Sequence, residues 1–256
     1  MNIVSKGLLY NLYKYPKETN KMGNTIVEFK NVTKQYGQGE AIQLANNDVN
    51  FTIEEGEFVV ILGQSGAGKS TVLNMLGGMD TPTSGTITVA GQEVSKMNDK
   101  ELSEYRAGTI GFIFQFYNLL PSLTAIENVS LVKNIVKSGP EPMEMLRAVG
   151  LGDHAKKFPS QMSGGEQQRV SIARALAKDP KIILGDEPTG ALDSETGVIV
   201  LELLSDLSRK QGKTVILVTH NADIAKCADK VIRMKNGKIR EIRINESPVP
   251  VREVEW

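Results

Sequence analysis

Short apolar runs rich in β-branched residues recur through the first third of the chain. Residues 25–32 alternate between apolar and polar positions, which is typical of a strand with one buried face. The apolar stretches 49–53 and 58–62 predict two further strands, and the pattern at 86–89 followed by Gly91 predicts a strand and a turn. This part of the chain is therefore expected to be mainly β-structure.

Helical and strand patterns alternate in the remainder. Residues 99–106 and residues from about 125 to 160 favour helix, the latter with a break at the Gly- and Pro-containing stretch 138–142. After residue 180 we expect strand, helix, strand and helix in turn, at 182–184, 198–211, 214–219 and 221–227. Such alternation is typical of a parallel α/β fold. Asn236-Gly237 predicts a hairpin turn between two last strands, at 231–234 and 238–244.

The sequence Gly-Gln-Ser-Gly-Ala-Gly-Lys-Ser at 63–70 fits the phosphate-loop pattern G-x-x-x-x-G-K-S/T. An apolar strand pattern at 57–62 precedes it and a helical pattern at 71–76 follows it, so the helix N-terminus would point at a bound anion. Glycines in such a loop allow positive φ angles and a close approach of the backbone to phosphate. The sequence therefore predicts that this chain binds a nucleoside triphosphate.

Two adjacent carboxylates supply the chemistry that such a loop needs. Lys69 is expected to reach the β- and γ-phosphates, and the Ser70 hydroxyl group to contact Mg²⁺. An apolar strand pattern at 181–185 ends in Asp186 and Glu187. Because successive residues at a strand end point in different directions, Asp186 is expected to face the metal and Glu187 the γ-phosphate and the attacking water.

A third motif resembles a known family. Ser163-Gly164-Gly165-Glu166 stands before a helical pattern at 170–177. Alone it would be an ordinary helix N-cap; between a phosphate loop and an Asp–Glu strand end it resembles the signature of ATP-binding cassette (ABC) ATPases. The resemblance covers roughly residues 25 to 240. It implies an α/β P-loop NTPase fold of the ABC type, with a RecA-like parallel core, an antiparallel β subdomain and a helical subdomain at about 116–165.

Residue by residue, the resemblance implies further roles. Tyr36 matches the aromatic residue that stacks on adenine, although a tyrosine there would also suit a strand edge. Gln115 matches the Q-loop glutamine that contacts Mg²⁺ and the attacking water, and residues 191–193 match the D-loop, which crosses a dimer interface. His220 matches the switch histidine beside the γ-phosphate, whereas a lone histidine is more often a structural residue.

The implied site uses ATP and Mg²⁺ and has three groups of residues. The catalytic group is Lys69, Gln115, Glu187 and His220. The magnesium ligands are Ser70, Gln115 and Asp186. The nucleotide contacts are Tyr36, Gly63, Gln64, Ser65, Gly66, Ala67, Gly68, Lys69, Ser70, Thr71, Ser163, Gly164 and Gly165.

Two positions depart from the family pattern. Gly185 stands where an apolar or small residue usually precedes the aspartate, and we expect only a small local loss of stability. Glu166 replaces the glutamine often found in the signature and adds a negative charge near the γ-phosphate unless its side chain points away. Residues 112–129 and 186–193 resemble the branch that contains macrolide exporters, lipoprotein-release ATPases and antimicrobial-peptide resistance transporters, with a division-associated ATPase as a near relative.

Composition narrows the function classes. Lysine plus arginine number 30 and aspartate plus glutamate number 30, so the zero net charge argues against a protein that coats nucleic acid. The single cysteine, Cys227, excludes an internal disulfide bond and a cysteine-built zinc site, and indicates a cytoplasmic protein. We find no apolar run of bilayer-spanning length and no secretory signal pattern, so we expect a peripheral protein at the cytoplasmic face of a membrane, held there by a separate permease.

The resemblance also implies two partners: a second copy in a head-to-tail ATP-sandwich dimer, and a membrane permease that docks near the Q-loop. A cluster of large apolar residues near Gln115 in the sequence is consistent with a permease-binding surface there. Its members are Phe114, Phe116, Tyr117, Leu119 and Leu120. DNA-repair cassettes carry long coiled coils between the phosphate loop and the signature, and the stretch from Lys69 to Ser163 is too short for one. A regulatory ATPase for a division or envelope-remodelling permease that moves no substrate stays open, and the cargo cannot be read.

The cassette is expected to span residues 25–245. Residues 1–24 form an extension, either an amphipathic arm or an expendable segment, and Met22 is an alternative start. Residues 246–256 form a tail that is expected to be extended, with Trp256 docked on a surface.

Overall fold

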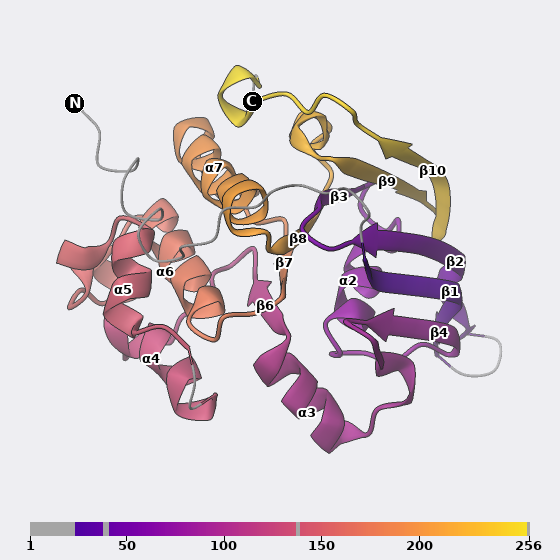
Figure 1. Cartoon of the computed structure of the whole chain (residues 1–256), viewed down its shortest axis with the longest axis horizontal. Coiled ribbons are helices and arrows are strands. Elements are labelled where there is room, and N and C mark those ends of the chain that lie inside the picture. Colours follow the sequence, from indigo (N-terminus) through magenta and orange to yellow (C-terminus); the bar gives the residue numbers. More distant parts are fainter. Residues whose placement is uncertain (1–23, 38–40, 137–138, 255–256) are drawn as a thin grey trace.

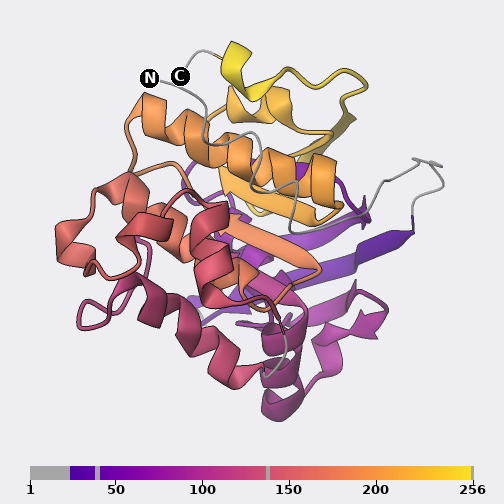
Figure 2. The same ribbon diagram turned by 60° about the vertical axis from the view of Figure 1, so that its left-hand side comes forward.

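The structure is a computed structural model that describes residues 24–37, 41–136 and 139–254. It contains two β-sheets and a set of helices that pack on both faces of the larger sheet (Figures 1 and 2). The expectations for residues 1–23 and for Trp256 lie outside the described residues. Within the described ranges, no helix is both long enough and apolar enough to span a bilayer.

The smaller sheet is antiparallel and has the strand order β2-β1-β4-β5. Its strands are β1 (Thr25–Tyr36), β2 (Gln43–Glu54), β4 (Ser84–Val89) and β5 (Gln92–Glu93). All three pairings between neighbours are antiparallel. Buried residues alternate with accessible ones along the second half of β2, as a sheet with one covered face requires. This sheet corresponds to the predicted antiparallel β subdomain.

The larger sheet has the strand order β10-β9-β3-β8-β7-β6. Its strands are β3 (Phe58–Leu62), β6 (Ile110–Ile113), β7 (Ile182–Asp186), β8 (Thr214–Thr219), β9 (Lys230–Lys235) and β10 (Lys238–Ile244). The strands from β9 to β6 pair in parallel, and the hairpin between β9 and β10 is antiparallel. Asn236 and Gly237 form its turn with φ angles of 51° and 71°, as the sequence predicted. Every residue of β3 and β8 is buried, which explains why β3 is wholly apolar and why β8 is apolar between its terminal residues Thr214 and Thr219.

Two separate hydrophobic cores lie on opposite faces of this sheet. Alternate residues of β3 feed them: Val59 and Ile61 belong to the core shared with the antiparallel sheet, whereas Phe58 and Val60 belong to the core under the other helices. The first core holds α2 (Lys69–Leu76) and α3 (Asp99–Gly108), and the second holds α6 (Gly164–Leu176) and α7 (Ser194–Gln211).

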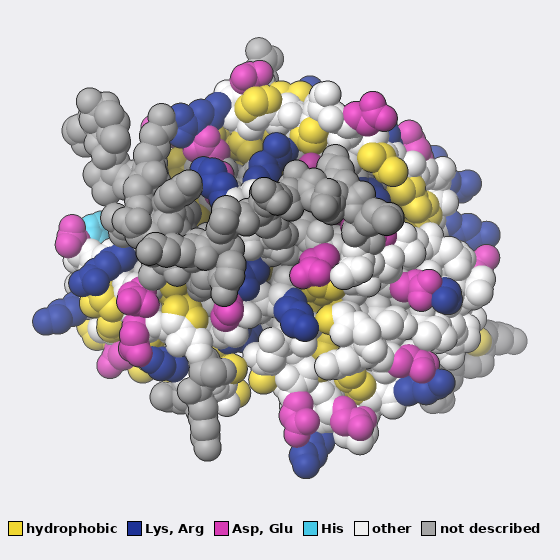
Figure 3. Space-filling view, viewed as in Figure 1, with side chains coloured by type: hydrophobic (Ala, Val, Ile, Leu, Met, Phe, Trp, Pro, Cys, Tyr) yellow, Lys and Arg dark blue, Asp and Glu magenta, His cyan; other side chains and the backbone are white. Residues whose placement is uncertain are grey.

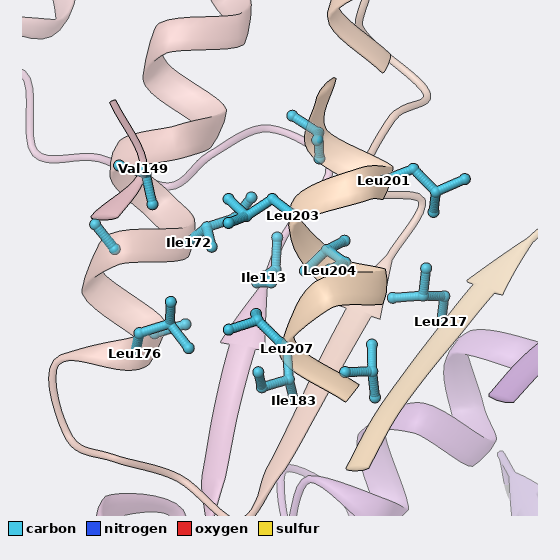
Figure 4. Packing of buried hydrophobic residues seen from close by; sticks show 14 of the residues in the cluster. Ile113, Val149, Ile172, Leu176, Ile183, Leu201, Leu203, Leu204, Leu207 and Leu217 are labelled. Atoms are coloured by element: carbon cyan, nitrogen blue, oxygen red, sulfur yellow. The ribbon is translucent and has the colours of Figure 1, made fainter. Parts of the chain in front are cut away.

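Leucine and isoleucine side chains close the second core. Figure 4 shows Ile172 of α6 and Leu203, Leu204 and Leu207 of α7 meeting Ile113, at the end of β6. All of these side chains are buried, and their burial supplies the main free energy that keeps α6 and α7 on the sheet.

A helical region follows β6. It contains α4 (Ala125–Ile135) and α5 (Pro142–Ala148), and the short 3₁₀ helices Gly152–His154 and Pro159–Gln161. The predicted break is confirmed, because α4 ends at Ile135 and Pro142 occupies the first turn of α5. These elements lie within the predicted helical subdomain. Further 3₁₀ helices are Val94–Lys96, Ile224–Cys227 and Val251–Glu253.

Two local predictions were wrong or incomplete. The helix expected at 221–227 is only a 3₁₀ helix from Ile224, because the Asn221 side chain accepts a hydrogen bond from the Asp223 backbone and forms a turn first. The tail is not wholly extended: it contains a 3₁₀ turn, and Val251 and Val254 are buried in the second core.

Candidate nucleotide-binding and catalytic site

The phosphate loop runs from β3 into α2, as predicted. Two neighbouring strands crowd its backbone: a Cβ atom on Gly63 would lie 2.6 Å from the Met234 carbonyl oxygen, and one on Gly68 would lie 2.5 Å from the Ala45 carbonyl oxygen. Gly68 also has a φ of 93°. Glycine is therefore required at both positions, since any side chain would force β2 or β9 to move.

Helix α2 begins at the end of this loop with its first-turn N–H groups uncapped by side chains and with no acidic residue in the first turn. An anion is the natural partner for such a helix end. Lys69 is only 7% exposed, and its Nζ atom donates to the Gln64 carbonyl oxygen at 3.1 Å, so its charge lies inside the loop. Ser70 Oγ donates to Asp186 Oδ1 at 3.2 Å, which joins the phosphate loop to the end of β7.

The two carboxylates at the end of β7 point in different directions. Asp186 faces Ser70, and burial raises the pKa of Asp186, an effect that the nearby Glu187 increases and the Ser70 hydrogen bond opposes. Glu187 has a left-handed φ of 45° and turns toward β8, where Thr219 Oγ1 donates to its Oε2 atom at 2.9 Å. Nδ1 of His220 lies 2.8 Å from Oε1 of Glu187. The predicted division of roles between the two carboxylates is therefore consistent with their positions.

Gln115 lies next to this pair. It follows β6, which pairs in parallel with β7, so both strands end at the same edge of the sheet. Nε2 of Gln115 would be 3.3 Å from a Cβ atom placed on Gly190, three residues after Glu187. A pocket of about 240 Å³ opens there, lined by residues of the loops after β7 and β8, among them Glu187, Asp193 and His220. The structure thus brings Lys69, Ser70, Gln115, Asp186, Glu187 and His220 to one edge of the sheet.

Tyr36 lies at the end of β1 beside the first turn of α2. Its Oη atom donates to Asp80 Oδ2 at 2.6 Å, and Nζ of Lys34 lies 4.9 Å from the centre of its ring. Burial and the Asp80 hydrogen bond raise the pKa of Tyr36, while a contact with Thr71 of α2 opposes the rise. The ring is 41% exposed, so a base can reach it. Asp80 and Lys34 are partners of Tyr36 that sequence reasoning missed.

The signature begins helix α6. Ser163 is its N-cap: Oγ accepts from the Glu166 N–H at 3.2 Å, and Oε2 of Glu166 accepts from the Ser163 N–H at 2.8 Å. Oε1 of Glu166 lies 2.6 Å from Nδ1 of His154. Burial acts to raise the pKa of Glu166, but the Ser163 backbone and the charges of His154 and Lys157 lower it overall. The extra carboxylate of this signature is therefore turned back on its own chain.

The signature and the phosphate loop are carried by helices on opposite faces of the larger sheet. Helix α2 packs in the core shared with the antiparallel sheet, and α6 packs in the other core beside α4 and α7. Figure 1 shows α6 and α2 on either side of the strands. Three of the predicted nucleotide contacts therefore lie at the start of a helix on the opposite face of the sheet from the helix that begins with Lys69 in the same chain. They are Ser163, Gly164 and Gly165.

Other functional neighbours went unnoticed in the sequence. Gly185 is needed more than expected, because a Cβ atom there would lie 2.7 Å from Leu217 Cδ2. Thr219 directly precedes the predicted His220, and Gln168 lies within the signature run, yet neither residue was assigned a role from the sequence alone.

On the face of the molecule seen in Figure 3, positively and negatively charged side chains are interspersed.

Comparison with known proteins agrees with this architecture. The family model described as ABC transporter matches residues 46–190. An uncharacterized ABC transporter ATP-binding protein of Methanocaldococcus jannaschii is 47% identical over 222 residues, which are 85% of this chain and 99% of the relative. One of Thermotoga maritima is 47% identical over 223 residues, which are 85% of this chain and 94% of the relative.

Solved structures match as well. The dimeric post-hydrolysis structure of the M. jannaschii ATP-binding cassette MJ0796, bound to ADP and Pi, has a TM-score of 0.80 and 43% identity, and the match covers 86% of this chain and 99% of that chain. A second dimeric structure of the same cassette gives the same values. The predicted ABC-type P-loop fold is confirmed. A family match over more than half of the chain, with relatives matched over nearly their whole length, shows that this protein belongs to the ABC transporter family and is an ATP-binding cassette ATPase.

Proposed function

We propose that this protein hydrolyses ATP with Mg²⁺ as the nucleotide-binding subunit of an ABC transporter. The observation that carries the proposal is the hydrogen bond between Ser70 and Asp186, with Glu187 next along the chain and facing the other way. Lys69 and the uncapped N-terminus of α2 bind the β- and γ-phosphates. Glu187 accepts a proton from the attacking water, and His220 holds Glu187 in place beside the γ-phosphate.

The residues at the sheet edge fit Mg²⁺. The Ser70 hydroxyl, the Asp186 carboxylate and the Gln115 amide offer oxygen donors, the kind of ligand that this ion prefers, and phosphate oxygens and water complete such sites. No group of three or more His, Cys, Asp or Glu residues suited to a metal occurs within the described ranges, and a magnesium site completed by ATP does not need one. A magnesium ion held by Ser70, Asp186 and Gln115 would supply positive charge that offsets the negative charge developing on the phosphates during hydrolysis.

The nucleotide base is proposed to stack on Tyr36, whose exposed ring stands beside Thr71 at the start of α2. The tyrosine hydroxyl is already engaged by Asp80, so the ring and not the hydroxyl group is left for the base. Stacking on an aromatic ring supplies affinity without a hydrogen-bond code.

Two chains are proposed to form a head-to-tail dimer around two ATP molecules. The support is that α6 lies on the opposite face of the sheet from α2, so one chain cannot bring its own signature to its own phosphate loop. The Ser163 side chain and the first N–H groups of α6 then meet the γ-phosphate held by the second copy. The solved MJ0796 cassettes are dimeric, which agrees with this arrangement.

A membrane permease is the proposed partner at the Q-loop, and it would hold the ATPase at the cytoplasmic face of the membrane. Phe116, directly after Gln115, is 75% exposed, and Leu120 nearby is exposed as well. Large apolar side chains grouped on a surface indicate a binding partner. Resemblance to exporter ATPases favours export or mechanical work at the envelope. An ATPase that regulates an envelope-remodelling permease and moves no substrate uses the same site chemistry and is the second candidate.

Replacement of Glu187 by Gln tests the ATPase proposal. The variant keeps the size of the side chain but cannot take the proton from water, so Mg²⁺-dependent phosphate release is expected to fall by a factor of roughly one hundred or more. Glu55→Gln, an exposed glutamate in the turn between β2 and β3, is the matched control and is expected to behave as wild type. Near-normal turnover by Glu187→Gln would contradict the assignment.

A further inference from the structure

Gln168 connects the signature helix to the loop that carries Glu187. Its side chain is fully buried, and Nε2 donates to the Pro188 carbonyl oxygen at 2.8 Å. Oε1 of the same amide is buried without a hydrogen-bond partner. The reverse orientation of the amide would place one oxygen against another, so the contact with Pro188 determines how Gln168 is oriented. A buried amide oxygen without a hydrogen-bond partner destabilises the folded state. The bond from Nε2 to Pro188 is the stabilising contact that this buried amide does make.

The backbone of Glu187 needs such support. A φ of 45° is disfavoured for a residue with a side chain and persists only where several contacts impose it. The Glu187 N–H donates to the Val218 carbonyl oxygen at 3.0 Å, and its carbonyl oxygen accepts from the Gly190 N–H at 3.0 Å. Those bonds come from β8 and from the same loop. Gln168 of α6 adds a hydrogen bond from a third element, and it donates to the carbonyl oxygen of Pro188, the residue directly after Glu187.

Helix α6 holds the Q-loop in a similar way. The Arg174 guanidinium group donates to the carbonyl oxygens of Tyr117, at 2.8 Å, and Asn118, at 2.5 Å. Both of these residues also have left-handed φ angles, 60° and 49°. At the first turn of α6, a Cβ atom on Gly165 would lie 2.0 Å from Thr196 Cγ2, so α6 also packs tightly on the start of α7. A displacement of α6 therefore cannot leave the loops after β6 and β7 unchanged.

We propose that Gln168 is a positioning residue for Glu187, and that through it α6 links the water-activating carboxylate of one ATP site to the signature that completes the other. The inference rests on the proposed function, because it assumes that Ser163 meets the nucleotide bound by a second copy. Contact of that nucleotide with the start of α6 is transmitted through Gln168 to the Pro188 carbonyl and hence to the Glu187 backbone. One buried hydrogen bond in each chain thus couples the two sites of the dimer.

Two adjacent glutamines allow a matched test. Gln168→Met removes the amide at nearly constant volume. Gln167→Met is the control: Gln167 Nε2 donates to the Met162 carbonyl oxygen at 3.1 Å, on the same helix but away from Glu187. We expect Gln168→Met to lower phosphate release at saturating ATP by roughly ten- to a hundredfold, the scale of a misplaced catalytic group. ATP-induced dimerisation, measured by light scattering with Glu187→Gln added to each variant, should be unchanged. Gln167→Met should resemble wild type in both measurements.

Several results would overturn the inference. One is equal turnover for the two variants, and another is a loss of turnover by Gln168→Met accompanied by an equal loss of dimerisation. If Gln168→Met does not fold, Gln168→Asn is the second variant, because it keeps a buried amide that is one methylene too short to reach Pro188. It should likewise show lowered phosphate release with unchanged ATP-induced dimerisation. Unfolding of both variants would show that Gln168 supports the fold as a whole, against the proposal. Absence of Mg²⁺-dependent turnover in the wild-type protein would instead count against the proposed function.

Discussion

The imidazole Nδ1 atom of His220 lies 2.8 Å from Oε1 of Glu187, although the two residues are 33 positions apart. They meet because β7 and β8 are parallel neighbours and end at the same edge of the sheet. Thr219 donates to the other oxygen of the same carboxylate. Both oxygens of Glu187 are thus oriented by Thr219, the last residue of β8, and by His220 directly after it, while the His220 side chain itself remains exposed to solvent. Such an arrangement holds the proposed catalytic carboxylate in one rotamer and leaves the histidine that orients it accessible to a bound nucleotide.

Ser163→Arg is expected to abolish ATP-dependent dimerisation. The substitution removes the N-cap of α6, at a cost of about 1 kcal/mol, and fills the space that the γ-phosphate of the partner's ATP would occupy. Thr124→Arg is a matched control, because Thr124 caps α4 through the same capping box with Glu127. Light scattering of both variants in a Glu187→Gln background, with and without ATP, distinguishes them. A Ser163→Arg protein that still dimerises with ATP would refute the signature's role.

Asp80→Ala is expected to weaken ATP binding and to leave the turnover number unchanged. The carboxylate accepts from Tyr36 and pairs with Lys34, and these contacts keep its pKa low despite partial burial. Loss of one such hydrogen bond is worth about 1 kcal/mol, or roughly a five-fold rise in KM. Tyr36→Phe removes the other half of the same hydrogen bond. The double variant should therefore be no worse than the poorer single variant, as measured by calorimetric titration with ATP; additive losses would contradict the link.

Phe116→Glu is expected to prevent co-purification with the proposed permease and to spare the ATPase activity of the isolated subunit. Phe116 is 75% exposed, so a carboxylate there costs the fold little but is unfavourable in an apolar interface. Tyr117 is a poorer target, because its hydroxyl group would be 2.7 Å from a Cβ atom on Gly164 of the signature. Ile244→Glu, a 70% exposed isoleucine on β10, controls for the change in charge and hydrophobicity. Normal co-purification of Phe116→Glu would place the docking surface elsewhere.

Lys178 makes the stability of the fold depend on alkaline pH. Burial, with a contribution from Arg106, lowers its pKa to about 8, and Nζ donates to the Arg106 carbonyl oxygen. Between this value and the unfolded value of about 10.4, the unfolded chain binds more protons, so this residue's contribution to stability rises with pH. Urea unfolding of wild type and Lys178→Met should show wild type gaining relative to the variant from pH 8 to 10. A constant difference between the two would contradict this explanation.

Local sequence patterns predicted several elements well. The bounds of β3 and β8 agree with the predicted 58–62 and 214–219, because strands buried on both faces contain a continuous apolar stretch that is readable in the sequence. The strand expected at 25–32 extends to Tyr36, since pairing with β2 and β4 outweighs the polar residues at its end. The helix expected at 221–227 was wrong because a side-chain turn at Asn221 competes with helix formation there.

The amino-acid pattern was enough to identify chemistry carried by residues that lie close together along the chain. The phosphate loop, the Asp186–Glu187 pair and the capped signature at Ser163 each depend on residues within a few positions, so their patterns are readable without a fold. Tertiary structure alone decided which distant residues support them, such as Asp80 for Tyr36, and Gln168 for the loop after Glu187. It also decided that α2 and α6 pack on opposite faces of one sheet, from which the need for a second chain was inferred. Strand order and core packing set these relationships, and neither leaves a periodic signal in the local sequence.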